Sequence, residues 1–64
     1  MCESAVYLAS DDGAEQLVLE EVVLLQPEPD GFLLVTLYGE QRHVQARIRK
    51  IDLLRHRVVL EPVP

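Results

Sequence analysis

The sequence is a succession of short runs of strand-forming residues separated by turn residues, and no run has the period of an amphipathic helix. The runs fall at residues 5–9, 16–19, 22–25, 32–37, 43–54 and 58–60. Turn signals separate several of them, at Asp11-Asp12-Gly13, Pro27-Glu28-Pro29-Asp30-Gly31 and Tyr38-Gly39-Glu40. This pattern predicts an all-β fold of five to six short antiparallel strands. Because a flat sheet of this size leaves its edges unprotected, we expect the strands to curl into a small β-barrel.

Four details refine the predicted strands. Glu20-Glu21 is a polar break that ends one strand before the next begins at Val22. Residues 22–25 and 32–37 are almost continuously apolar, so both faces of these strands should be covered. Residues 51–54 should continue as a strand into a hairpin that turns at Arg55-His56. Over residues 43–49 the side chains alternate. Val44, Ala46 and Ile48 should point inward, whereas the other face is basic and exposed (His43, Gln45, Arg47, Arg49).

The chain has 64 residues, which is enough for one small domain spanning 1–64. A core of this size barely offsets the conformational entropy lost on folding. The single cysteine cannot form a disulfide within the chain, so a metal or a partner subunit is the remaining source of stability. We therefore expect a homodimer.

The sequence lacks a run of about 20 apolar residues, and its first residues do not have the pattern of a secretory signal. We expect a cytoplasmic protein with no membrane partner. Motifs of nucleophile elbows, phosphate-binding loops and zinc hydrolases are also missing from the sequence. These observations predict that the protein is not an enzyme.

The net charge of -5 is divided unevenly along the chain. Residues 1–40 carry nine acids and no Lys or Arg, whereas all six bases follow residue 40 together with two acids. A basic segment at 42–57 on a small barrel is compatible with RNA binding, and this is the alternative function. The acidic pI near 4.7 and the lack of aromatic residues in that segment argue against a nucleic-acid partner. Pairing between acidic and basic strands explains the same division of charge.

Cys2 is the residue whose chemistry is most specific. A thiolate is a ligand for nickel, copper(I) or zinc, although a lone thiol is also common as a small buried hydrophobe. The terminal amine of Met1 and the imidazole of His43 are candidate nitrogen ligands, and His56 between two arginines is a weaker one. In a twofold dimer each ligand occurs twice, so two Cys2 thiolates and two nitrogen donors would complete a planar Ni(II) site between the subunits.

Four sequence features, taken in order, resemble the CooT family. They are Met1-Cys2-Glu3, the strand Leu17-Val18-Leu19-Glu20 followed by Val22, Tyr38-Gly39-Glu40, and Ile51-Asp52-Leu53. The resemblance implies a homodimer of SH3-like β-barrels that binds nickel through Cys2 and takes part in carbon monoxide dehydrogenase maturation. It also implies a likeness to the HypC-type hydrogenase chaperones, in which the second-position cysteine is important. No role carries over from the family to His43 or His56.

Overall fold

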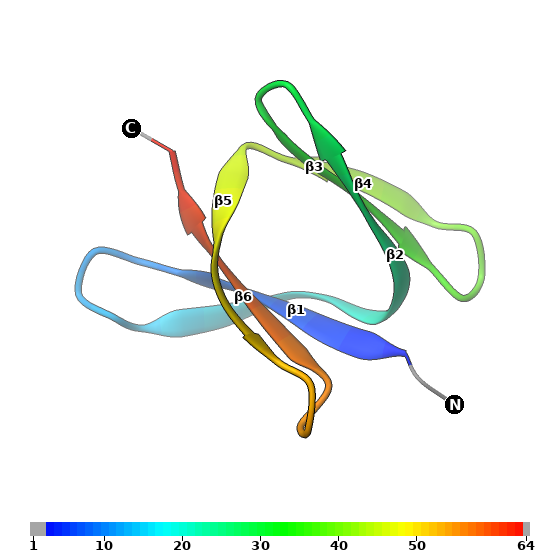
Figure 1. Ribbon diagram of the computed structural model, residues 1–64, viewed down its shortest axis with the longest axis horizontal. Coiled ribbons are helices and arrows are strands. Elements are labelled where there is room, and N and C mark those ends of the chain that lie inside the picture. Colours follow the sequence, from blue (N-terminus) through cyan, green and yellow to red (C-terminus); the bar gives the residue numbers. More distant parts are fainter. Residues whose placement is uncertain (1–2, 64) are drawn as a thin grey trace.

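A computed structural model describes residues 3–63, and every regular element in that range is a β-strand. The strands are β1 (Ser4–Ala9), β2 (Glu15–Glu28), β3 (Gly31–Thr36), β4 (Gln41–Val44), β5 (Ala46–Asp52) and β6 (Arg57–Pro62). They form one sheet in the order β4-β3-β2-β1-β6-β5, which curls on itself into a half-barrel (Figure 1). The prediction of a small all-β barrel is confirmed. Residues 3–63 contain no helix that could cross a membrane.

The pairing of β1 with β6 differs from the antiparallel arrangement that the sequence predicts. These two strands run parallel, with Val6 opposite Val58 and Leu8 opposite Leu60, whereas the other pairs are antiparallel. Parallel neighbours cannot be joined by a hairpin and need a long connection. Here the connection is the whole of β2 to β5, so the pairing brings the two ends of the described chain side by side.

The two strands predicted at 16–19 and 22–25 are in fact one strand, β2, of 14 residues. Glu20-Glu21 does not end it. Glu21 adopts a left-handed φ of 58°, and the register with both neighbours shifts nearby. Irregularities of this kind bend a strand. As a result the first half of β2 pairs with β1, and the second half pairs with β3.

The second half of β2 is not covered on both faces, as its apolar sequence suggests. Val22 is buried, but Val23 and Leu24 are 53% and 46% exposed. After the bend one face of the strand leaves the core and turns outward. In β3 the expectation holds better, because Leu34 is fully buried and Phe32 is half-buried against the core.

The alternating segment after β3 forms two strands at opposite edges of the sheet, with Gln45 alone between them. Val44 and Ala46 turn inward as predicted, whereas Ile48 is exposed. Gly31 lies directly against this corner. A Cβ on Gly31 would stand 2.0 Å from the Val44 carbonyl oxygen and 2.9 Å from the Gln45 Cα. Only glycine permits this approach, which fixes the path of the chain from β4 to β5.

The core lies inside the curl and receives side chains from five of the strands. Its buried members are Val6, Leu19, Val22, Leu34, Ala46 and Leu60. Leu8, Val18, Leu25, Phe32, Val44 and Val58 pack around them and are partly buried. The predicted strand runs thus supply the core, although they do so from a bent β2 and a parallel β1–β6 pair.

The β1–β2 turn and the β5–β6 turn lie where the sequence predicts turns. Gly13 has a φ of 87°, and the Asp12 carboxylate accepts hydrogen bonds from Ser10 Oγ at 2.5 Å and from the Ala14 amide at 3.0 Å. The last hairpin turns at residues 53–56, which include the predicted Arg55-His56. β5 ends at Asp52, so Leu53 and Leu54 belong to this turn and do not extend the strand as predicted.

Candidate functional site

The barrel end at which β1 begins is the part of the described structure nearest in sequence to Cys2. Cys2 and Met1, two of the three predicted ligands, lie outside the described residues. Ser4 pairs with Val22, and the Ala5 amide donates a hydrogen bond to the His56 carbonyl oxygen at 2.9 Å. The bend of β2 and the β5–β6 turn therefore flank the first residues of β1 (Figure 1).

The β5–β6 turn presents two adjacent leucines to solvent. Leu53 is 80% exposed and Leu54 is 89% exposed. The turn has a defined shape, because Asp52 Oδ1 accepts a hydrogen bond from the Arg55 amide at 3.1 Å and His56 has a left-handed φ of 54°. Together with the bond from Ala5 to His56, these contacts hold an apolar projection beside the start of β1.

The bend of β2 and the β3–β4 turn contribute further exposed side chains. The Leu37 amide donates to the Glu21 carbonyl oxygen at 2.8 Å, which places the β3–β4 turn against the bend. The exposed apolar and aromatic residues of the three segments around β1 are Val23, Leu24, Leu37, Tyr38, Leu53 and Leu54, and we call them the apolar end surface. Neighbouring exposed apolar residues of this kind are typical of interaction sites.

Acidic groups lie among these apolar residues. The carboxylate of Glu21 accepts a hydrogen bond from the Tyr38 hydroxyl, and this bond, followed by the negative charges of Glu21 and Glu3, raises the pKa of Tyr38 above its usual value. Glu3 Oε2 is buried and has no hydrogen-bond partner within residues 3–63. The electrostatic potential at this end of the barrel, where Glu3 directly follows Cys2 in the sequence, therefore favours a cation.

His43, the third predicted ligand, lies on the edge strand β4 opposite Leu33. Two strands, β2 and β3, separate it from β1 in the sheet. Its Nδ1 is 2.6 Å from Glu28 Oε1, and its side chain is 71% exposed. Within the described residues no three His, Cys, Asp or Glu side chains form a cluster that could hold a metal ion. His43 is thus paired with a carboxylate and is not brought to the start of β1 within one chain.

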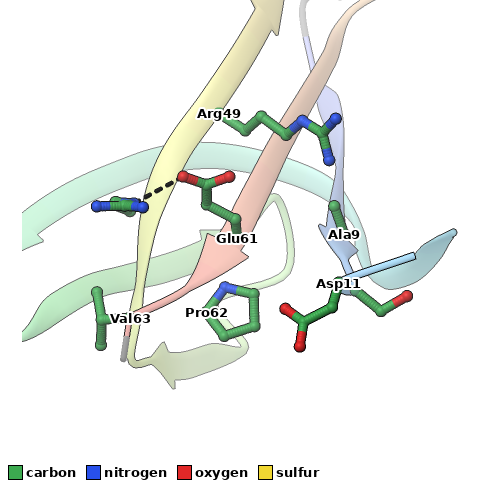
Figure 2. Close-up of a pocket in the computed structure, with 8 residues that line it drawn as sticks. Ala9, Asp11, Arg49, Glu61, Pro62 and Val63 are labelled. Atoms are coloured by element: carbon green, nitrogen blue, oxygen red, sulfur yellow. Dashed lines mark hydrogen bonds and ion pairs between the residues drawn. The ribbon is translucent and has the colours of Figure 1, made fainter. Parts of the chain in front are cut away.

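Most of the basic residues in segment 42–57 are paired with carboxylates. Arg47 Nε is 2.6 Å from Glu61 Oε2 (Figure 2), and Arg57 Nη2 is 3.9 Å from Glu15 Oε1. Arg55 Nε is 3.9 Å from Asp52 Oδ2. Arg47 and Arg55 thus pair with the two acids of their own part of the chain, whereas Arg57 pairs with an acid from residues 1–40. Pairing between the acidic and the basic part accounts for only some of the division of charge.

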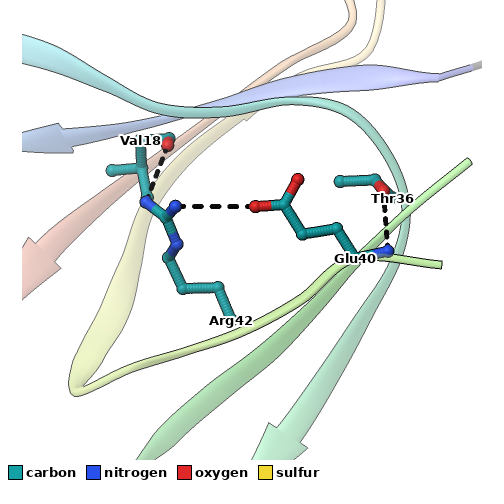
Figure 3. Close-up of polar contacts among 4 residues, drawn as sticks. All are labelled: Val18, Thr36, Glu40 and Arg42. Carbon is teal, nitrogen blue, oxygen red and sulfur yellow. Dashed lines mark hydrogen bonds and ion pairs between the residues drawn. The ribbon is translucent and has the colours of Figure 1, made fainter. Parts of the chain in front are cut away.

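Arg42 contacts both a carboxylate and a main-chain carbonyl oxygen. Its Nη2 lies 3.6 Å from Glu40 Oε2, and its Nη1 donates to the Val18 carbonyl oxygen at 3.1 Å (Figure 3). Glu40 is positioned by its own amide, which donates to the buried Thr36 Oγ1 at 3.1 Å. Arg42 therefore supports the barrel instead of offering a free cation.

Comparison with known proteins identifies the family to which this barrel belongs. The sequence profile of the family described as CO dehydrogenase accessory protein CooT matches residues 1–61. The chain belongs to the CooT family. Its members are accessory proteins of CO dehydrogenase, which agrees with the expectation of a non-catalytic role.

Individual proteins similar to this chain match it over nearly its whole length. A crystal structure described as that of CooT from Carboxydothermus hydrogenoformans has a TM-score of 0.89 and 33% identity, covering 98% of this chain and all of that one. An uncharacterized protein of Methanothermobacter thermautotrophicus is 30% identical over 95% of this chain and 89% of its own length. Another, from Methanocaldococcus jannaschii, is 26% identical over 95% of this chain and 98% of its own. The similarity to the CooT family thus covers nearly all of this chain.

The sequence predicts Leu53 and Leu54 as part of a strand and residues 22–25 as a strand covered on both faces. It therefore does not predict that these residues are exposed together at this end of the CooT barrel. The available signal was Asp52 followed by two leucines and then Arg55-His56, because an aspartate that caps a turn places the next residues at its tip. Apolar residues at such a tip cannot reach the core.

Proposed function

We propose that this protein binds Ni(II) through Cys2 at the interface of a homodimer and supplies nickel during maturation of carbon monoxide dehydrogenase. Membership of the CooT family supports the link to this enzyme. The chemistry of the ligands supports nickel, since thiolate and amine donors suit this metal better than hard cations such as magnesium. Two copies of Cys2, with the amines of Met1 or main-chain nitrogen atoms, provide four donors.

The observation that carries the dimer is the apolar end surface. Six exposed apolar or aromatic side chains surround the start of β1, two residues after Cys2. Burying them against a second copy removes apolar area from water, and this stabilises association at about 25 cal/mol for each Å². A twofold axis through this surface would bring the two Cys2 residues together, as a shared metal site requires.

Native mass spectrometry with nickel tests the proposal, because it reports the oligomeric state and the metal count together. We expect one nickel ion for each dimer and its loss in the Cys2→Ser variant. Unchanged nickel stoichiometry and affinity in Cys2→Ser would show that the metal binds elsewhere. His43→Gln decides the remaining ligand: lower nickel affinity assigns His43, and unchanged affinity leaves the nitrogen donors to the N-terminal residues.

Delivery to the enzyme needs a separate measurement. Nickel-free carbon monoxide dehydrogenase should regain activity faster with the nickel-loaded protein than with the same total nickel in the presence of a chelator. Because thiolate ligands must lose their protons before they bind, nickel affinity should also fall as the pH is lowered. Equal activation by the Cys2→Ser protein mixed with the same total nickel and chelator would contradict a role of this site in delivery.

A further inference from the structure

The outer edge of β5 is an unpaired strand edge. β5 pairs with β6 on one side and is the last strand of the sheet, so no strand within residues 3–63 pairs with its other side. Every residue from Arg47 to Ile51 is exposed. A strand in this position presents main-chain donors and acceptors to which an extended segment of another chain can add.

The charges on β5 are distributed differently from those on the rest of the molecule. Of the six Lys and Arg residues, four (Arg42, Arg47, Arg55 and Arg57) have a carboxylate within 4 Å. The other two are neighbours on β5, Arg49 and Lys50, and neither has a carboxylate within that distance among the described residues. In a protein of net charge -5, the cations without a partner are thus concentrated on one edge strand.

A groove lies next to these cations. It has a volume of about 680 Å³, and its apolar lining comes from Ala9, Pro62 and Val63. Figure 2 shows the Arg49 side chain stretched across β6 towards β1, while Glu61 is paired with Arg47. This direction points away from the outer edge of β5, but the Arg49 side chain is exposed and has no carboxylate within 4 Å among the described residues. Rotation about its side-chain bonds can therefore bring the guanidinium to a segment added at that edge. The ladder between β5 and β6 also shifts register between Ile48 and Lys50, so Arg49 is the extra residue of a bulge. A bulge of this kind re-aims side chains from their regular alternation.

We propose that the outer edge of β5 binds an extended, acidic polypeptide segment of a partner protein by strand addition, with its Asp or Glu side chains paired to Arg49 and Lys50. The main-chain edge supplies affinity for any extended segment, and the two cations select an acidic one. Ile48 and Ile51, which are also exposed on β5, provide apolar contacts between the charges. The surface is distinct from the apolar end surface proposed for the dimer.

Charge also decides against two other occupants of this edge. A second copy that paired through its own β5 would bring its Arg47, Arg49 and Lys50 close to the same three cations of the first copy, and like charges on paired strands are destabilising. Proteins that bind single-stranded nucleic acid typically combine a basic groove with exposed aromatic rings on which bases stack, and β5 carries no aromatic residue. Of the aromatic residues, Tyr7 is covered by Arg57 at 4.4 Å, Phe32 is half-buried, and Tyr38 belongs to the apolar end surface.

Fluorescence anisotropy with synthetic peptides tests the proposal. The probe is a labelled seven-residue peptide of alternating Glu and Val with blocked ends, which matches the length of β5. One control peptide replaces Glu by Gln, and another carries N-methyl groups that remove its ladder donors. Arg49→Gln and Lys50→Gln are the test variants. Arg55→Gln is the matched control, because it removes an exposed arginine that is already paired with Asp52.

We expect the Glu peptide to bind at low salt and to lose at least about twofold in affinity with each test variant and about fivefold or more with both. Arg55→Gln should change affinity less than twofold, and both control peptides should bind weakly. Amide chemical shifts should change at residues 47–51. The proposal is overturned if the Glu peptide does not bind, if the Gln or N-methyl peptide binds equally well, if Arg55→Gln has the same effect, or if an oligonucleotide displaces the peptide.

Discussion

Arg42 and Val18 connect two strands that are not neighbours in the sheet. The Arg42 guanidinium on β4 donates from Nη1 to the Val18 carbonyl oxygen in the first half of β2 at 3.1 Å. β3 lies between β4 and β2 in the sheet order, and the bend at Glu21 turns the first half of β2 away from β3. The bond thus joins β4 to the first half of β2, between which no main-chain ladder runs within residues 3–63 (Figure 3).

Replacing Arg42 by Met should therefore destabilise the fold. A hydrogen bond of this type contributes about 1 kcal/mol to the free energy of unfolding, and part of that is recovered because the freed carbonyl can bind water. Urea denaturation at neutral pH measures the change. Arg49→Met is the matched control, because it removes an exposed arginine without an intramolecular carboxylate and should shift stability by less than about 0.5 kcal/mol. Equal effects of the two substitutions would contradict a bridging role for Arg42.

Gly31→Ala should be more harmful than any surface change. The new Cβ would collide with the Val44 carbonyl oxygen and the Gln45 Cα, which belong to the main chain and cannot rotate away. Overpacking of this kind costs about 3 kcal/mol, and the corner between β4 and β5 should move. Gly39→Ala offers a comparison, since its Cβ meets no atom within 4 Å and only the φ of 87° opposes it. The cost there should be about 1 kcal/mol. Denaturation curves of the two variants would refute this account if their order were reversed.

Features of the fold that depend on neighbouring residues were predictable from the sequence, and those that depend on distant contacts were not. Asp12-Gly13 predicts its own turn because the carboxylate caps it and glycine accepts the positive φ. The continuity of β2 across Glu21 depends on the Leu37 amide, 16 positions later, and the parallel pairing of β1 with β6 joins opposite ends of the chain. No local pattern records either contact.

The residues of the candidate site also differ in whether the sequence alone points to them. Cys2 could be singled out from its chemistry and from the resemblance to the CooT family, because both are properties of the sequence itself. The apolar end surface could not, since Leu53 and Leu54 have the composition of a strand. Asp52 caps the turn that contains both leucines, and the bond between Ala5 and His56 fixes the far side of that turn. Leu53 and Leu54 therefore lie beyond the end of β5 and are exposed.

Substitution of Leu53 and Leu54 by Ser should weaken the dimer and leave the folded subunit intact. Both side chains are almost fully exposed in one chain, so the subunit loses little packing. In the dimer each buried leucine contributes about 1.5–3 kcal/mol, so the dissociation constant should rise at least tenfold. Analytical ultracentrifugation measures it. Leu17→Ser is the control, because Leu17 is also exposed but pairs with Tyr7, further along β1 than the residues at its start. An equal loss of the dimer in both variants would argue against the apolar end surface.

The Asp12 carboxylate should titrate below the usual range. Hydrogen bonds from the Ser10 hydroxyl and then from the Ala14 amide stabilise its charged form and lower its pKa. A group whose pKa is lowered by folding contributes stability above its unfolded pKa, near 3.9, and loses it as the pH falls through the folded value. Carboxyl chemical shifts followed by NMR should show a midpoint below 3.9, and Ser10→Ala should move it upward. If the midpoint does not change in Ser10→Ala, the hydroxyl is not the cause.

The pKa of Tyr38 should lie above its usual value, in contrast to the lowered pKa of Asp12. The hydrogen bond to Glu21 and the negative charges of Glu21 and Glu3 favour the neutral phenol, which raises its pKa. Stability from this group is complete below the unfolded pKa, near 10, and is lost as the pH rises through the folded value. Glu21→Gln removes the charge but keeps a side chain that can accept a hydrogen bond, so the pKa of Tyr38 should fall towards 10 without returning fully. Absorbance of the phenolate in a Tyr7→Phe background measures it. Because Tyr38 belongs to the apolar end surface, the same titration in the dimer should show a further rise as the phenol loses water, and no such rise would place Tyr38 outside the interface.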